Sequence, residues 1–92
     1  MSEEKVTREV VIQNVIDIFI ETLGFLDEDE KASVNENTHI INDFNVVDID
    51  SMAFGIALVE KFSVKPDLEE WGQAARIGEV ADVFIKYMNK KP

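Results

Sequence analysis

The sequence of 92 residues contains no cysteine, a single histidine and few basic residues. Without cysteine, neither disulfides nor thiolate–metal sites can hold the fold, so its stability must come from apolar packing. Only 9 Lys and Arg stand against 19 Asp and Glu, which gives a formal net charge of −10. Binding to nucleic acid or to an anionic membrane surface relies on Lys and Arg, so neither partner is expected. Such an acidic chain is steered toward basic partners, which we expect to be proteins.

Long hydrophobic runs and glycine-rich loops are also missing. The longest mostly apolar stretches, residues 10–20 and 49–59, carry polar residues and are too short to span a bilayer. The N-terminal residues 1–5 show no apolar run after a basic cluster, so we expect no secretory signal and a cytoplasmic location. The four glycines are scattered and form no phosphate-binding loop. The length predicts one domain, residues 1–92, with one small core.

Apolar residues recur at helical spacing in three parts of the chain. Residues 6–23 predict a helix, with Thr7 or Ser2 as its N-cap and Gly24 as its stop. Residues 51–62 predict a second helix, in which Met52, Ile56 and Val59 are spaced for one face. Residues 80–89 predict a last amphipathic helix after a break at 77–80, and residues 68–75 predict a short one.

The connection from residue 24 to residue 50 shows neither helical nor strand periodicity. Its acidic run, residues 27–30, is expected to be a solvated loop, and its apolar residues are expected to hold the connection against the core. No segment alternates with a period of two between tight-turn residues. The sequence therefore predicts an all-α fold with three longer helices, one short helix and a long first loop.

No catalytic or metal-binding constellation stands out in the sequence. His39 is alone in the long loop, in a chain without cysteine, and we interpret it as a packing or surface residue. The acidic segments lack the glycine and terminal acid of a calcium-binding loop. We therefore expect no enzymatic activity, no catalytic residue and no metal site.

The most informative local feature is Asp48-Ile49-Asp50-Ser51-Met52. It places a serine hydroxyl between acidic residues and a hydrophobic one, at the predicted start of a helix. A helix N-terminus has unpaired N–H groups and a positive dipole end, which stabilise a phosphate attached there. A simpler interpretation is that Asp50 or Ser51 only caps the helix.

At this motif the chain resembles the acyl carrier protein family, a group of small acidic four-helix bundles with a long loop between the first two helices. Asp50-Ser51-Met52 is similar to the family's Asp-Ser-Leu signature at the start of its second helix. The resemblance extends over most of the chain. Further similar segments are Asn42-Asp43-Phe44, Ala57-Leu58-Val59-Glu60-Lys61-Phe62, Val64-Lys65-Pro66-Asp67 and Ile77-Gly78-Glu79-Val80, with Tyr87-Met88 at the end.

The resemblance implies that Ser51 bears a 4′-phosphopantetheine arm, transferred from coenzyme A by a phosphopantetheinyl transferase. The thiol of that arm would carry acyl groups as thioesters, in a chain that has no thiol of its own. Further partners would be acyl-transferring and acyl-activating enzymes with basic docking patches, and the carrier would be a monomer in a specialised lipid, cell-envelope or secondary-metabolite pathway. The expected recognition residues are Asp48, Asp50, Met52, Phe54 and Glu60.

Two departures from the family pattern leave alternatives open. A gap-free alignment of residues 44–62 places Asp48 where the family has its serine. Since a phosphodiester requires a hydroxyl, we predict Ser51 as the attachment site, with a longer loop and a shorter second helix; a carrier-like domain that has lost its site is the alternative. The second helix is also nearly all apolar, and Phe54 is either a core residue or an exposed partner contact. An unmodified helical adaptor that binds a protein through this apolar surface is therefore a second hypothesis.

Overall fold

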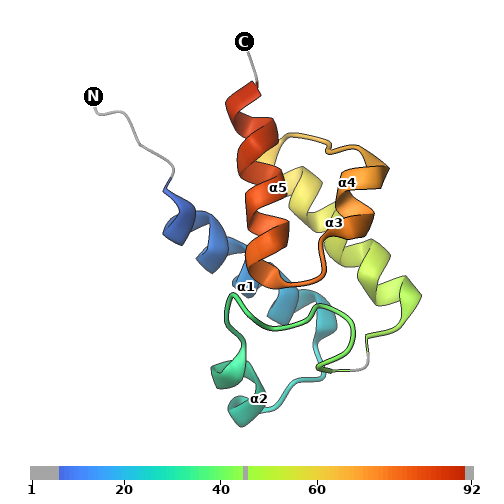
Figure 1. Cartoon of the computed structure of the whole chain (residues 1–92). Coiled ribbons are helices and arrows are strands. Elements are labelled where there is room, and N and C mark those ends of the chain that lie inside the picture. Colours follow the sequence, from blue (N-terminus) through green and yellow to red (C-terminus); the bar gives the residue numbers. More distant parts are fainter. Residues whose placement is uncertain (1–6, 45, 91–92) are drawn as a thin grey trace.

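A computed structural model describes residues 7–44 and 46–90, except for the side chains of Asp48, Leu68, Trp71 and Lys90 and the exposure of Gly72. The described chain is all-helical and forms a small helical bundle, as the sequence predicts (Figure 1). An isolated antiparallel bridge between His39 and Arg76 is its one β-type pairing, and the described ranges contain no strand. The helices are α1 (Arg8–Leu23), α2 (Glu28–Ser33), α3 (Asp48–Phe62), α4 (Leu68–Gln73) and α5 (Ile77–Lys90).

Helix α1 has the N-cap and the stop that its sequence predicts. The Thr7 hydroxyl accepts a hydrogen bond from Val10 N at 3.2 Å and caps the start. Gly24 ends the helix in the left-handed conformation, with φ of 69°. Four residues of α1 are buried at spacings of four, namely Val11, Val15, Phe19 and Leu23.

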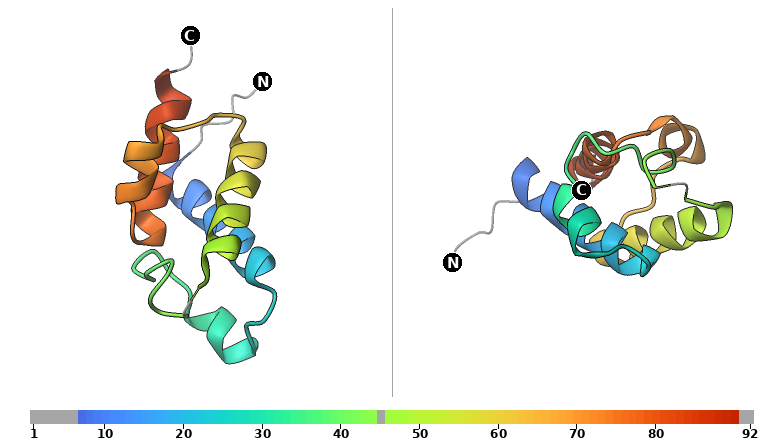
Figure 2. Two further views of the ribbon diagram at one scale, coloured as in Figure 1. Left: turned by 90° about the vertical axis from the view of Figure 1, so that its right-hand side faces the viewer. Right: turned by 90° about the horizontal axis from the view of Figure 1, so that it is seen from below.

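The three long helices enclose one core. Helix α1 packs against both α3 and α5, and α4 packs against α5. The two views in Figure 2 show the connection between α1 and α3 gathered at one end of the bundle. Val34, Ile40 and Val46 of this connection are buried, so the predicted anchoring of the loop to the core is confirmed. None of the helices in the described ranges combines the length and apolar character needed to cross a membrane.

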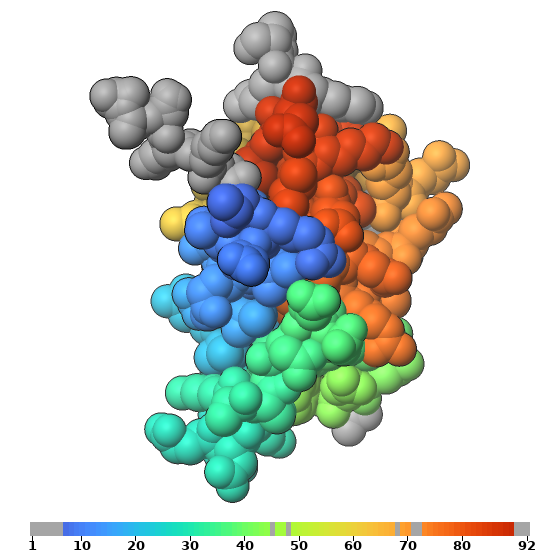
Figure 3. All heavy atoms as spheres, turned by 60° about the vertical axis from the view of Figure 1, so that its left-hand side comes forward, coloured from blue at the N-terminus to red at the C-terminus, as the bar shows by residue number. Residues whose placement is uncertain are grey.

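The acidic run within the connection is helical, so its prediction as a loop is wrong, whereas its predicted exposure to solvent is confirmed. The Asp27 carboxylate accepts from Glu30 N at 2.8 Å, and the Glu30 carboxylate accepts from Asp27 N at 3.0 Å. This reciprocal capping box starts α2, whose first-turn acids also face the positive end of the helix dipole. Figure 3 shows this segment on the surface at one end of the molecule.

Helix α3 begins at Asp48, three residues before the predicted start. Val47 is the N-cap residue and makes no side-chain capping bond, so neither Asp50 nor Ser51 caps the helix as predicted. The helix is 15 residues long, and the shortened second helix inferred from the motif is therefore wrong. A valine N-cap has no sequence signature, because the usual signal is a side-chain oxygen.

Helix α5 also begins earlier than predicted, at Ile77, because its own third residue caps it. The Glu79 carboxylate accepts hydrogen bonds from Ala75 N at 2.7 Å and from Arg76 N at 3.0 Å. These two backbone donors, Ala75 first, lower the pKa of Glu79 below its ordinary value of 4.5, with a further contribution from the positive charge of Arg76. The break expected at residues 77–80 is thus the first turn of the helix.

We expect the substitution Glu79→Gln to reduce stability in a pH-dependent way. A depressed folded-state pKa stabilises the fold above the ordinary value of 4.5, and this contribution disappears as the pH falls through the lower folded-state value. Glutamine keeps an acceptor oxygen but cannot ionise. Urea unfolding of both proteins should show a lower midpoint for the variant near pH 7, and a smaller gap at about pH 3. An equal gap at both pH values would show that the charge of Glu79 contributes nothing.

Candidate functional site

Ser51 lies in the first turn of α3, as the fourth residue of the helix. Its backbone N–H donates to Val47 O at 3.0 Å, so this amide is already used inside the helix. The first four amides of a helix, counted from the N-cap, have no partner within it, and here they belong to residues 47–50. The side chain of Ser51 is half-buried. A phosphate on its hydroxyl would therefore sit at the edge of the region where the helix dipole acts.

The expected recognition residues are only partly brought together. Asp50 is half-buried and Met52 is exposed, and both adjoin Ser51 in the first turns of α3. Glu60 is exposed but lies nine residues further along α3, which is about 14 Å along the helix axis. The side chain of Asp48 lies outside the described residues. Glu60 thus belongs to the opposite end of the helix from the candidate attachment site.

Phe54 belongs to the core, so its use as an exposed partner contact is ruled out. Its side chain is only 2% exposed, and its ring meets that of Phe19 edge-on at a centroid distance of 5.2 Å. Leu58, one helical turn later, is fully buried. The buried face of α3 therefore runs through Phe54 and Leu58 instead of the face marked by Met52 and Ile56.

The opposite side of α3 exposes large apolar side chains. Ile49, Met52 and Ile56 follow one another at helical spacing, with exposed fractions of 77%, 66% and 59%, and Val47 before them is 59% exposed. We call these four residues the α3 stripe. Apolar residues on a surface helix usually face the core, so an exposed stripe of this kind marks a candidate contact surface. Of its members only Met52 is among the recognition residues expected from the sequence, because two apolar faces on one helix cannot be ranked from spacing alone.

The connection that leads into α3 is tied to the start of α5 by backbone hydrogen bonds. Ile40 N donates to Ala75 O at 2.8 Å, and Ile77 N donates to Thr38 O at 3.0 Å. The Arg76 guanidinium adds a bond to Asn37 O at 2.6 Å. These contacts hold residues 37–40 in place ahead of the α3 stripe.

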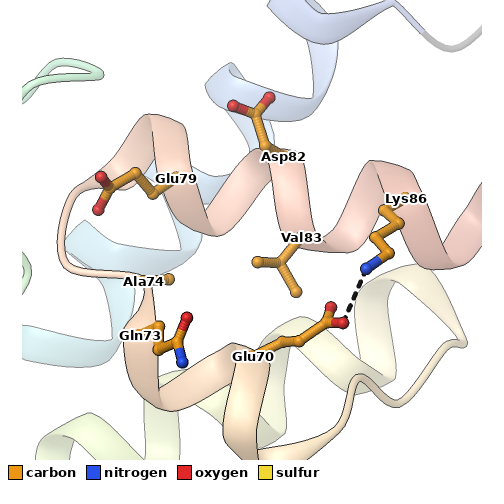
Figure 4. Close-up of a pocket in the computed structure, with 7 residues that line it drawn as sticks. All are labelled: Glu70, Gln73, Ala74, Glu79, Asp82, Val83 and Lys86. Carbon is orange, nitrogen blue, oxygen red and sulfur yellow. Dashed lines mark hydrogen bonds and ion pairs between the residues drawn. The ribbon is translucent and has the colours of Figure 1, made fainter.

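An open cavity of about 350 Å³ lies between α4 and α5 (Figure 4). Three carboxylates line it, and each already has a partner. Glu70 accepts from Lys86 Nζ at 2.7 Å, which raises the pKa of Lys86, and Glu79 caps α5. Asp82 accepts from Arg8 Nε at 2.8 Å. Among the described residues, no group of three or more His, Asp or Glu is arranged to hold a metal ion.

The arrangement offers a hydroxyl in the first turn of α3 and an apolar stripe beside it. The resemblance to acyl carrier proteins depends on the sequence segments quoted above. Searches with protein-family models and against curated protein sequences find no match to this chain.

Proposed function

We propose that the protein is a phosphopantetheine-bearing acyl carrier, with the arm attached to the hydroxyl of Ser51. The observation that carries this proposal is the position of Ser51, partly exposed in the first turn of a 15-residue helix that follows a long connection. Ile49 and Met52 on either side are exposed, so a transferase can approach the serine. The signature-like Asp50-Ser51-Met52 supplies the chemical reason for choosing this residue.

In this proposal the arm provides the thiol that the chain lacks. Ser51 Oγ loses its proton and attacks the phosphorus of coenzyme A that bears the pantetheine, the P–O bond of the diphosphate breaks, and adenosine 3′,5′-bisphosphate leaves. The resulting phosphodiester joins Ser51 to the arm, and the thiol at the far end carries an acyl group as a thioester. The chain itself performs no catalysis. Its role is to present the arm to successive enzymes, which recognise the surface around the first turn of α3.

The direct test is incubation of the purified protein with coenzyme A and a broad-specificity phosphopantetheinyl transferase. Intact-mass spectrometry should show a gain of one phosphopantetheine group per chain, and peptide mapping should place the group on Ser51. An unchanged mass, with a known carrier modified in the same mixture, would rule the proposal out.

The α3 stripe favours a second candidate function, an unmodified adaptor that binds a protein partner. Val47, Ile49, Met52 and Ile56 together expose apolar surface. Burying such side chains against a partner contributes about 25 cal/mol for each Å² of apolar area removed from water. An adaptor of this kind would need no prosthetic group.

The two functions predict different results when variants are tested for binding to a protein partner that the wild-type protein has captured. For the adaptor, Ser51→Ala should bind as well as the wild type, whereas combined Ile49→Gln, Met52→Gln and Ile56→Gln should lose binding. For the carrier, Ser51→Ala should lose the partners that engage the arm. Glutamine is a good helix former and these positions are exposed, so each variant should remain folded. Circular dichroism checks that condition.

A further inference from the structure

We propose that His39 is a pH-sensitive latch on the turn that leads into α3. The imidazole Nδ1 accepts two backbone hydrogen bonds, from Ile41 N at 3.2 Å and from Asn42 N at 3.0 Å. A nitrogen that accepts hydrogen bonds carries no proton, so the ring must be neutral, with its proton on Nε2. The two hydrogen bonds that close the turn from residue 39 to residue 42 therefore form only while Nδ1 of His39 is unprotonated.

Protonation of the ring removes the acceptor on which the turn depends. Both nitrogens of an imidazolium are donors, so Nδ1–H would face the two N–H groups that it now binds. The ring must then rotate away, and the N–H groups of Ile41 and Asn42 donate hydrogen bonds to water instead. Both residues are exposed, so water can reach these amides once the ring has left. Among the ordinary side chains, only an imidazole can change its charge in this way near neutral pH.

The groups around the His39 ring carry charges of both signs. Asp43 Oδ2 accepts from His39 N at 2.9 Å, and the Glu79 carboxylate on α5 interacts electrostatically with the ring. Both carboxylates attract an imidazolium. Arg76, the bridge partner of His39, opposes it. The groups around the ring thus include two carboxylates and one guanidinium.

The turn is coupled to the segment that precedes α3. Ile41 O accepts a hydrogen bond from Val46 N at 2.9 Å, one residue before the N-cap Val47. The ring of Phe44, two residues after that turn, lies 6.2 Å from that of Phe19 in the core. Opening of the loop turn at residues 39–42 therefore changes the contacts that hold the first helical turn of α3 and its neighbours in place. This consequence is the same for a carrier and for an adaptor.

The test is a pH titration of ¹⁵N-labelled protein by NMR between about pH 8 and pH 5.5, a range above the titration of ordinary carboxylates. At the upper end, the ring spectrum should show the proton on Nε2. As the pH falls, the amide signals of Ile41 and Asn42 should move together with the ring signals of His39. The amide signals of the helices should stay dispersed throughout, because the turn opens within a folded bundle.

The matched control is His39→Asn, because the amide oxygen of asparagine takes the place of Nδ1 as an acceptor but does not titrate. In this variant the signals of Ile41 and Asn42 should stay constant over the same range. A proton found on Nδ1 at the upper pH would overturn the proposal. So would amide signals that ignore the titration of the ring, or that move equally in wild type and variant.

Discussion

The substitution Phe19→Ala should reduce the free energy of unfolding by about 3–5 kcal/mol. Phe19 is 1% exposed and lies where α1 meets α3, with the rings of Phe54 at 5.2 Å and Phe44 at 6.2 Å. Removing its ring leaves a cavity bordered by two other aromatic side chains. Small domains have a total stability of about 5–15 kcal/mol, so this loss is a large part of the whole.

Phe25→Ala is the matched control for this prediction. The same ring is removed, but Phe25 is 55% exposed, so the change should stay within about 0.5–1 kcal/mol. Urea unfolding followed by circular dichroism measures both variants. Equal losses for the two phenylalanines would contradict the described core. If Phe19→Ala does not fold, Phe19→Leu keeps most of the apolar volume and should give a smaller loss in the same direction.

The substitution Ser51→Ala should abolish the mass gain produced by coenzyme A and the transferase. Alanine has no hydroxyl, so no phosphodiester can form at this position. The fold should be retained, because alanine is the best helix former and Ser51 lies within α3. Intact-mass spectrometry measures modification, and the unfolding midpoint shows whether structure is preserved. A full mass gain in the variant would place the arm elsewhere or exclude the proposal.

Asp48→Ser on the Ser51→Ala background separates the two registers of the motif. Asp48 is the first residue of α3, and in the gap-free alignment it stands where the family has its serine. If Ser51 is the attachment site, the double variant should stay unmodified. If the wild type is unmodified and the single change Asp48→Ser creates a modified protein, the chain is a carrier-like domain that has lost its site.

The sequence predicts the three long helices because apolar residues recur in them at helical spacing. Phe19 and Leu23 of α1 are examples, and both are buried. The first residues of the helices are harder to predict from periodicity. Helix α3 begins after Val47, which has no capping oxygen, and α5 begins before Glu79, which caps it from inside. Helix α2 did have a readable signal, since Asp27 and Glu30 have the spacing of a capping box.

The candidate site is harder to predict because it depends on which apolar face of α3 is buried. Phe54 and Met52 are both large and apolar, yet Phe54 is in the core and Met52 is 66% exposed. Only the packing of α3 against α1 decides between them. The hydrogen bonds of His39 likewise cannot be predicted from the sequence, because its ring binds the backbone of its own turn. The geometry of that loop is not encoded in any periodic pattern.

The most direct test of the carrier proposal is an intact-mass spectrum of the protein purified from the cells that naturally make it, followed by peptide mapping. The proposal predicts a mass above that of the polypeptide by one phosphopantetheine group, with an acyl group on part of the population and the arm on Ser51. A spectrum that contains only the bare polypeptide, or an arm on another residue, would contradict it.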